Sequence, residues 1–384
     1  MKILITTDLY TTETNGVVTS VKNLSDELGK KGHDVRILTL SEHSKSYRKD
    51  NVYYVKSLPL GIYPDVRMSV AYWSRFVKEL VDWCPDIIHS QCEFFSFQYA
   101  LKISKHTGAP IVHTYHTLYE QYVGYVIPVK KMGKYIVKFL SKNRLKKVEE
   151  VIAPTHKVED TLKGYGIEGN VKVIPSGISI EKHGQRLSPE ERSKKRRELG
   201  INDDDIVLLN LGRLGTEKNL DELLNYYSEA LRSNDRLKFM IVGDGPARGD
   251  LEELSEKLNL SGRVIFTGMV SPENVQKYYQ LGDIFVSAST SETQGLTYIE
   301  AAANGLPLLC REDLCLKNVI KNGENGYSYT NVDEFLEDIE LIVKDPEWMK
   351  SAREKSEEIA KSFNKESFGN NIEDMYQEIL DSKK

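Results

Sequence analysis

Short apolar runs that alternate with helical patterns are the feature that most constrains this chain, and they fall into two series. The first series of strand-like runs is Lys2–Thr7, Val35–Leu40, Val52–Lys56, Asp86–Ser90, Pro110–Thr114, Glu150–Ala153 and Val171–Ile174. The second is Ile206–Leu211, Leu237–Val242, Arg263–Thr267, Asp283–Ala288 and Leu306–Leu309. Helical patterns separate them, at Val17–Lys31, Leu220–Leu231, Asp250–Leu258 and Thr297–Asn304 among others. The alternation predicts an α/β fold whose parallel sheets are covered by helices on both faces.

The chain has 384 residues, more than one hydrophobic core usually supports, so we expect two domains. A charged stretch with few apolar residues, Glu181–Asp205, separates the two series. We place the linker at 181–205, an N-terminal domain at 1–180 and a C-terminal domain at 206–364. The end of the chain, from Trp348 to Lys384, has a helical pattern, and we expect about 365–384 to pack back on the N-terminal domain.

Composition excludes several classes of protein. Apolar residues make up 40% and charged residues 28%, which is unlike disordered, collagen-like or disulfide-rich chains. No apolar run approaches the roughly 18–20 residues that span a bilayer, and Met1–Thr7 leads directly into a strand without a signal peptide. Four cysteines lack ligand-like spacing, which gives little support to metal or disulfide sites. We therefore expect a soluble cytoplasmic protein.

Two strand–loop–helix transitions suit phosphate binding. Leu208–Asn219 is a strand followed by a glycine-bearing loop with the cations Arg213 and Lys218. The first series opens in a similar way, with a loop that holds Asn15-Gly16 before a helix. Ligands bind at the carboxyl ends of parallel strands, where helix N-termini offer amides to phosphate. Two such domains facing each other would form a cleft for a nucleotide-linked donor and an acceptor.

A pair of acids lies between the last two strand-like runs of the second series. Glu292 and Glu300 follow the strand Asp283–Ala288 and are eight residues apart. A carboxylate can accept two sugar hydroxyls, and Gly295 between the acids lets the backbone approach a phosphate. The alternative is that Glu292 caps the helix and Glu300 lies on its solvated face.

These motifs resemble a known family. Glu292 and Glu300 match the E-x7-E signature of retaining glycosyltransferases of the GT-B fold, specifically glycosyltransferase family 4. Gly212-Arg213 with Lys218-Asn219 is similar to that family's donor-diphosphate motif, and Asn15–Val18 occupies the place of its N-terminal glycine loop. The resemblance covers essentially the whole chain and implies two Rossmann-like domains that face each other across a cleft.

Two stretches narrow the resemblance further. Residues 113–120 and 287–297 resemble bacterial enzymes that glycosylate diacylglycerol or monoglycosyl-diacylglycerol. This branch implies a retaining transfer of a hexose, glucose by preference, from a UDP-sugar to such a lipid at the cytoplasmic membrane face. The alternatives are a soluble or polyprenyl-linked acceptor, or a GT-B protein that is an epimerase or only binds nucleotide sugars. Donor sugar, acceptor headgroup and oligomeric state stay open.

The resemblance also implies roles at the donor. Arg213 and Lys218 would hold the diphosphate and stabilise the charge on the departing nucleotide. Glu300 would hold the ribose, and Gly16 would bring the N-terminal loop to the diphosphate. Because the two cations neutralise the phosphates, the resemblance implies no metal and no other cofactor.

At the transferred sugar, the resemblance implies contacts from Glu292 and from the amides of Gly295, Leu296 and Thr297. His116 would lie near the donor sugar and the reaction centre. The alternative for His116 is a buried histidine bonded to backbone, and the sequence does not separate its role from that of His113.

A basic segment indicates a membrane surface. Pro128–Lys147 carries eight cations and no acid, within an N-terminal half (1–175) that has 25 Lys and Arg against 18 Asp and Glu. Its apolar residues recur at helical spacing at Met132, Ile136, Phe139 and Leu140. Its lysines, at Lys130, Lys131, Lys134, Lys138 and Lys142, would bind anionic headgroups, as in a basic amphipathic helix. The alternative is a helix that packs its apolar stripe inward. Nucleic acid is a poor partner, since the rest of the chain is acidic.

Overall fold

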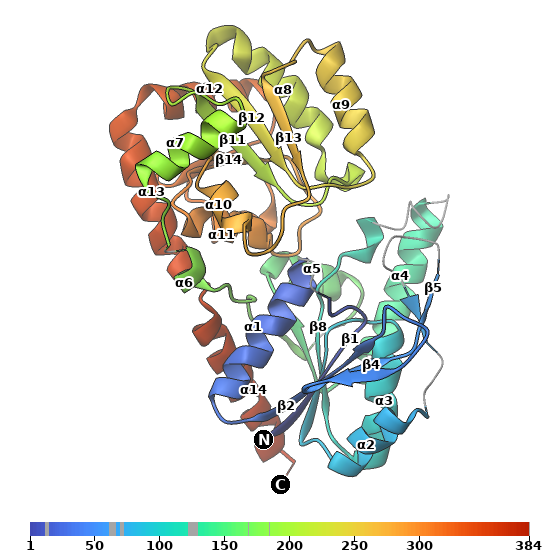
Figure 1. The fold of residues 1–384 in the computed structure, drawn as a ribbon. Helices are drawn as coiled ribbons and strands as arrows, with labels where there is room; N and C mark the ends of the chain where they lie inside the picture. The colour runs from blue at the N-terminus through green and yellow to red at the C-terminus, as the bar shows by residue number, and fades with distance from the viewer. Residues whose placement is uncertain are drawn as a thin grey trace. The chain divides into compact units, whose positions relative to one another are not determined.

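The computed structural model describes residues 1–11, 15–60, 67–69, 73–121, 130–167, 169–183 and 185–383. The chain divides into two compact units, coloured along the chain in Figure 1. Unit 1 is Met1–Gly177 together with Lys365–Lys384, and unit 2 is Ile178–Asn364. The chain therefore passes from one unit to the other twice.

Unit 1 is built on an eight-stranded sheet with the strand order β10-β9-β8-β7-β1-β2-β4-β3. Its strands are β1 (Lys2–Thr7), β2 (Asp34–Leu40), β3 (Tyr47–Lys49), β4 (Val52–Val55), β7 (Ile87–Ser90), β8 (Ile111–Thr114), β9 (Glu150–Ala153) and β10 (Val171–Val173). All neighbours are parallel except β3 and β4. A small separate ribbon pairs β5 (Leu58–Pro59) with β6 (Arg67–Met68). The strand order reverses between β1 and β7, and such a switch point opens a crevice at the strand ends.

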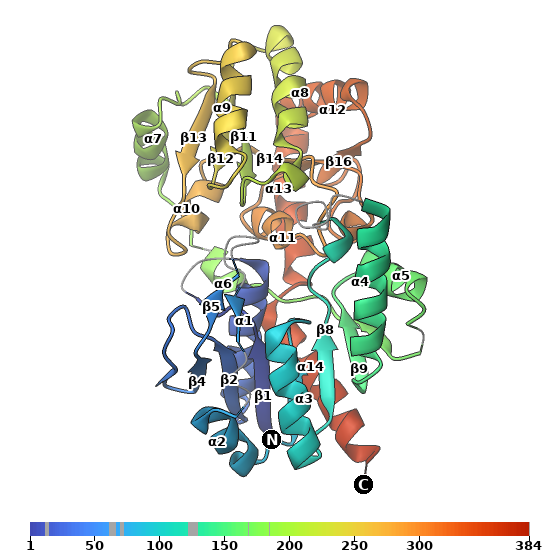
Figure 2. The same cartoon turned by 90° about the vertical axis from the view of Figure 1, so that its right-hand side faces the viewer.

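Helices cover both faces of this sheet (Figures 1 and 2). Ile3 and Ile5 of β1 pack with α1 (Gly16–Lys30) and α14 (Lys365–Asp381), whereas Leu4 packs with α2 (Arg75–Trp83) and α3 (Phe95–Thr107). The alternation follows from the period of two in a strand. Among the described residues, the other helices of unit 1 are η1 (Tyr119–Gln121), α4 (Lys130–Leu145) and α5 (His156–Gly164).

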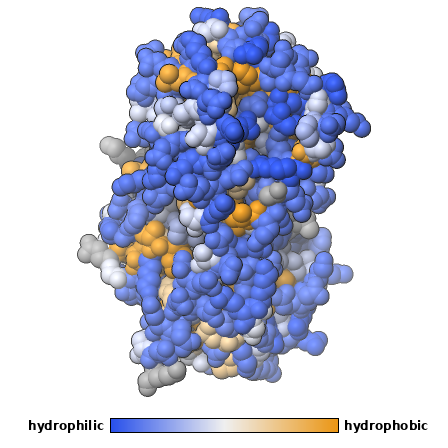
Figure 3. Space-filling model, turned by 90° about the vertical axis from the view of Figure 1, so that its left-hand side faces the viewer, coloured by the Kyte–Doolittle hydropathy of each residue, from blue (hydrophilic) through white to orange (hydrophobic). Residues whose placement is uncertain are grey.

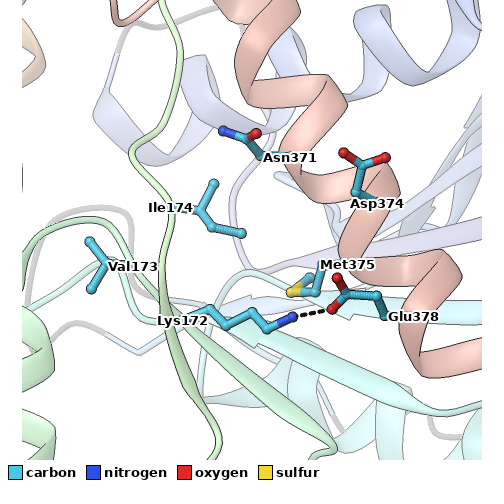
Figure 4. Close-up of a pocket in the computed structure, with 7 residues that line it drawn as sticks. All are labelled: Lys172, Val173, Ile174, Asn371, Asp374, Met375 and Glu378. Carbon is cyan, nitrogen blue, oxygen red and sulfur yellow. Dashed lines mark hydrogen bonds and ion pairs between the residues drawn. The ribbon is translucent and has the colours of Figure 1, made fainter. Parts of the chain in front are cut away.

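The last helix, α14, belongs to unit 1 although it ends the chain. It packs against α1, and the hydroxyl of Tyr376 lies 2.6 Å from Nδ1 of the buried His89 on β7. A hollow of about 420 Å³ lies between α14 and the edge strand β10, where Lys172 forms an ion pair with Glu378 (Figure 4). None of the residues that line this hollow is a predicted site residue.

Unit 2 has a six-stranded parallel sheet with the order β13-β12-β11-β14-β15-β16. Its strands are β11 (Ile206–Leu211), β12 (Leu237–Val242), β13 (Val264–Gly268), β14 (Ile284–Ser287), β15 (Leu308–Arg311) and β16 (Gly326–Tyr329). One face is covered by α8 (Leu220–Ser233), α9 (Arg248–Lys257) and α12 (Val332–Lys344). The other is covered by α10 (Val275–Tyr279), α11 (Leu296–Ala303) and α13 (Pro346–Lys361). Here the order reverses between β11 and β14.

The stretch 181–205, which the sequence predicts to be a linker, is a folded part of unit 2. It contains α6 (Ile180–His183) and α7 (Pro189–Glu198), which starts with a capping box between Ser188 and Glu191. Arg196 on α7 is only 1% exposed and donates to the carbonyl of Leu281 and the carboxylate of Asp283. The helix is therefore anchored by a buried ion pair, which apolar periodicity does not reveal.

Candidate active site

The switch point of unit 2 begins with the loop after β11. Gly243, at the end of the neighbouring β12, has φ +133°, and a Cβ there would lie 1.9 Å from the carbonyl oxygen of Gly212. Only glycine allows these two strand ends to approach so closely. Arg213 follows Gly212 directly. Its guanidinium forms an ion pair with Glu217, whose side chain is 5% exposed. Arg213 is thus held at the strand end by a nearly buried carboxylate.

The second cation meets one of the two predicted acids. Lys218 ends the short helix η3 (Thr216–Lys218), and its Nζ lies 2.5 Å from Oε1 of Glu292. Ser289 donates to the same carboxylate oxygen at 3.0 Å. Asn219, which follows Lys218 with φ +50°, donates through Nδ2 to the carbonyl of Ala288 at 3.1 Å. The structure therefore joins the loops after β11 and β14 and brings Lys218 and Glu292 together.

Glu292 is not the N-cap residue of α11. The residue before the helix is Gly295, with φ +74°. A Cβ on Gly295 would lie 2.5 Å from Cδ2 of Tyr298, so glycine is required. Leu296 and Thr297 are the first helical residues, and the N–H groups of a first turn have no partner within their own helix. This end of α11 can therefore offer amides to an anion.

Glu300 does not lie on a solvated face either. It is partly buried, and the hydroxyl of the fully buried Tyr279 on α10 donates to its Oε2 at 2.8 Å. Burial raises the pKa of Glu300 to about 7, and the bond from Tyr279 opposes that rise. A carboxyl with such a pKa can change its charge near neutral pH.

In unit 1, Gly16 lies at the start of a helix rather than in a loop. It is the first residue of α1, and Oδ1 of the capping Asn15 accepts from the amide of Val18 at 2.8 Å. Asn15 thus satisfies one of the amides that a helix N-terminus leaves unpaired. The positively charged end of the helix macrodipole is here, near the end of β1.

The structure separates the two histidines that the sequence leaves together. His113 is the fully buried third residue of β8, and its Nε2 lies 3.2 Å from Oε1 of Glu93. His116 lies beyond the strand, is less buried, and has its Nε2 2.6 Å from Oε1 of Gln91. This contact joins the ring to a side chain that follows the neighbouring strand β7. Burial, with a smaller contribution from His113, lowers the pKa of His116 to about 3, so its ring is neutral at neutral pH.

Two polar residues around these histidines, and one beside Arg213 in unit 2, were not predicted from the sequence. Gln91 and Glu93 follow β7, next to the switch point, and the carboxylate of Glu93 also accepts from the hydroxyl of Tyr119 at 2.5 Å. Glu217 was missed in unit 2. Their position in the chain could have indicated them. Residues that follow β7 and β11 lie at the carboxyl ends of strands at a switch point, where ligands bind.

The basic segment forms α4, but its faces differ from the prediction. Its side chains are described from Met132 onward, so those of Lys130 and Lys131 lie outside the described residues. Met132, Tyr135 and Phe139 are 53%, 71% and 56% exposed, so the apolar stripe does not pack inward. The inward residues are instead Gly133, Ser141 and Leu145, which are buried, and Val137, which is partly buried.

The described lysines of α4 are partly engaged by the protein. Lys138 donates to the carbonyl of Gly164 at the end of α5 at 2.7 Å, and Nζ of Lys142 lies close to Gly166. Lys134 is 3.5 Å from Glu120 on η1. The exposed face of α4 is therefore apolar, and the lysines lie along its margins.

Figure 3 shows a surface on which hydrophilic residues predominate and apolar residues form small separate groups. In the part of the chain that the structure describes, no helix is both long and apolar enough to cross a bilayer. Nor do three or more His, Cys, Asp or Glu side chains gather there as ligands for a metal ion.

Comparison with known proteins identifies the family. The family described as "Glycosyltransferase Family 4" matches residues 14–182, and "Glycosyl transferases group 1" matches residues 191–362. The chain is 34% identical to the alpha-monoglucosyldiacylglycerol synthase of Streptococcus pneumoniae over 384 residues, 99% of this chain and 86% of the relative. It is 29% identical to the alpha-monoglucosyldiacylglycerol synthase of Acholeplasma laidlawii, over 99% of this chain and 98% of the relative.

Solved structures agree on the fold. The HepE protein of Anabaena, in complex with UDP-glucose, has a TM-score of 0.77 at 17% identity and covers 98% of this chain and 100% of its own. Sucrose-phosphate synthase from Thermosynechococcus elongatus has a TM-score of 0.78 at 19% identity and covers 99% of both chains. These matches confirm the GT-B fold with two Rossmann-like domains. By its matches along nearly the full length, the chain belongs to glycosyltransferase family 4.

Proposed function

We propose that this glycosyltransferase moves a glucosyl group from UDP-glucose to diacylglycerol or a monoglycosyl-diacylglycerol and retains the α configuration. The observation that carries the donor half is the meeting of Lys218 and Glu292 at the switch point of unit 2, beside the open end of α11. The names of the relatives from S. pneumoniae and A. laidlawii support the lipid acceptor.

The donor is bound mainly by unit 2. Arg213 and Lys218 hold the diphosphate, and each is already paired with a carboxylate that phosphate oxygens would replace or share. The amides of Gly295, Leu296 and Thr297 bind phosphate at the start of α11. Glu300, fixed by Tyr279, accepts from the ribose hydroxyls. Such groups stabilise the charge that develops on the leaving diphosphate.

The transferred sugar is contacted by Glu292 and by His116 of unit 1. His116 is neutral, so it acts as a hydrogen-bonding group rather than as a cation. Gly16, at the start of α1, presents backbone amides toward the diphosphate. The acceptor hydroxyl attacks the face from which the diphosphate departs, and the leaving phosphate takes its proton. With two cations and helix amides at the phosphates, the reaction needs no metal.

Unit 1 brings the enzyme to its lipid acceptor at the cytoplasmic membrane face. The exposed Met132, Tyr135 and Phe139 of α4 insert among lipid headgroups, and the lysines at the margins contact anionic lipid. An exposed apolar stripe flanked by cations is the arrangement of helices that lie in a membrane interface.

Product analysis tests this function. The protein is incubated with UDP-glucose or UDP-galactose and vesicles that contain diacylglycerol or glucosyl-diacylglycerol, with and without EDTA, and the product lipids are resolved. We expect an α-glucolipid whose yield EDTA leaves largely unchanged, and much less product from the Lys218→Ala variant. A β-anomeric proton signal would exclude retention, loss of activity in EDTA would indicate a metal site, and glycosylation of soluble or polyprenyl acceptors alone would exclude the lipid assignment.

A further inference from the structure

Gln91 is held rigidly at the end of β7, next to the switch point of unit 1. Its backbone amide donates to the carbonyl of Thr6, the next-to-last residue of β1, at 2.8 Å. Gln91 is only 1% exposed, so its side chain is buried. A buried, backbone-anchored amide has little freedom to reorient, so whatever it contacts is oriented with it.

The group that it contacts is His116. Oε1 of Gln91 lies 2.6 Å from Nε2 of His116, and the residue before His116 is fixed by a bond from the amide of Tyr115 to the carbonyl of Ile152 on β9 at 2.9 Å. An amide oxygen only accepts hydrogen bonds. A neutral imidazole carries one N–H, so this contact requires the proton on Nε2 and leaves Nδ1 as an acceptor.

The two neighbouring histidines of unit 1 are bonded to other side chains. His113 is paired with Glu93, and His89 lies between Tyr376 and the hydroxyl of Thr114, with Nε2 to Oγ1 at 2.7 Å. Nε2 of Gln91 has no hydrogen-bond partner among the described residues. A buried amide nitrogen without a partner is costly, so Gln91 is not explained by the stability of the fold alone.

We infer that Gln91 is a positioning residue that fixes the ring of His116 with its proton on Nε2, so that Nδ1 faces the reaction as an acceptor. The inference rests on the proposed role of His116 at the transferred sugar. Gln91 would thus set the tautomer of the histidine without touching the substrate itself.

Nitrogen-15 NMR of the histidine side chains in the full-length protein tests the tautomer without any substrate. His116→Asn assigns the signals by their loss. We expect Nε2 protonated and Nδ1 unprotonated in the parent, the same pattern in Gln91→Glu, and a mixed or reversed pattern in Gln91→Leu. Gln98→Leu on α3 is the matched control and should leave the pattern unchanged.

Kinetics then connect the tautomer to turnover. Gln91→Leu should lower kcat by about 10-fold to 100-fold with little change in the donor KM, whereas Gln91→Glu should retain more of the activity because it keeps an acceptor oxygen. A parent protonated on Nδ1, or a Gln91→Leu variant with parental tautomer and kcat, would overturn the inference. If His116→Asn is fully active while the NMR pattern holds, the role of His116 fails instead, and with it the function of this contact.

Discussion

The two units use the same topology for opposite chemistry. Each is a parallel sheet whose strand order reverses, and in each the polar side chains follow the strands at the reversal. In unit 2 these side chains are partly exposed ion pairs, Arg213 with Glu217 and Lys218 with Glu292. In unit 1 the polar side chains at and beside the reversal include two histidines that burial keeps neutral, His89 within β7 and His116 beyond the neighbouring β8.

The difference matches what each unit binds in the proposed reaction. A diphosphate carries charge in both ground and transition state, so its site needs cations that remain partly solvated until it arrives. A sugar and an acceptor hydroxyl are neutral, so directional hydrogen bonds from uncharged groups suit them. One fold therefore supplies an ionic half and a neutral half, and each half can be altered separately.

The largest expected effect is on the ionic half. Arg213→Ala and Lys218→Ala each remove about 2–4 kcal/mol of transition-state stabilisation, which lowers kcat/KM about 30-fold to 900-fold. Steady-state kinetics with UDP-glucose measure the loss. Lys257→Ala, which removes an exposed ion pair on α9, is the control and should behave as the parent. Parental turnover in both site variants would contradict the assignment of the cations.

The second effect distinguishes two ways in which unit 1 can meet a membrane. Tyr135→Ser with Phe139→Ser should reduce vesicle affinity by at least about tenfold, because full burial of one such side chain contributes roughly 1.5–3 kcal/mol. The variant with Lys131, Lys134, Lys138 and Lys142 changed to Gln should lose less than the roughly 1 kcal/mol per charge expected of free lysines. Lys138 already bonds to the carbonyl of Gly164 at the end of α5, and Lys142 lies close to Gly166.

Vesicle sedimentation with phosphatidylglycerol, at low and high salt, measures both variants. Binding of the parent should weaken as salt rises, because a Debye length of about 8–10 Å screens the lysines, but the apolar contribution should remain. Binding of UDP to unit 2 should stay unchanged in both variants. If the apolar variant binds vesicles as tightly as the parent, this face of α4 does not meet the membrane.

A smaller effect follows from the pKa of Glu300. Burial raises it to about 7, so Glu300 is protonated below that pH and ionised above it. An ionised carboxylate accepts ribose hydroxyls better, so the donor KM should fall by several-fold as the pH rises from 6 to 8. Glu300→Gln should raise KM and flatten this dependence. A large loss of kcat at unchanged KM would instead place Glu300 at the reacting sugar.

The smallest expected effect concerns the neutral half. Because the pKa of His116 lies near 3, it does not titrate between pH 5 and 8 in the folded protein, and kcat should show no step in that range from this residue. Its contribution to stability has a definite sign. The folded pKa is below the unfolded value of about 6.5, so stability from His116 is complete above pH 6.5 and decreases as the pH falls toward 3. Chemical unfolding of the parent and of His116→Asn across this range checks it.

Much of the fold follows from local pattern. The predicted strands Lys2–Thr7, Ile206–Leu211 and Leu237–Val242 have the observed bounds, because buried parallel strands are continuous apolar runs between turns. The strand Gly326–Tyr329 was not predicted, since it is short, polar in part and at a sheet edge. The helix of 189–198 was missed because its anchor is the buried guanidinium of Arg196.

The residues of the site that belong to sequence motifs could be predicted, but their contacts with one another could not. The pairing of Lys218 with Glu292 joins residues 74 apart in the chain, and only the adjacency of β11 and β14 brings them together. Gln91 and Glu93 carry no motif, and their meaning depends on the histidines of the next strand. The sequence pattern predicts individual strands and helices, whereas the contacts between residues of different strands depend on the strand order of the sheet.

The position of α14 has a consequence for synthesis. Phe368, Ile372, Met375, Tyr376 and Ile379 complete the core of unit 1 on the side of α1, yet they follow the whole of unit 2 in the chain. At about 5–20 residues per second, the ribosome needs about 1–4 s to add α14 after the last residue of unit 2. Unit 1 therefore completes its core after unit 2 has all of its residues, and a message truncated before α14 would release a complete unit 2 joined to a unit 1 with an open core.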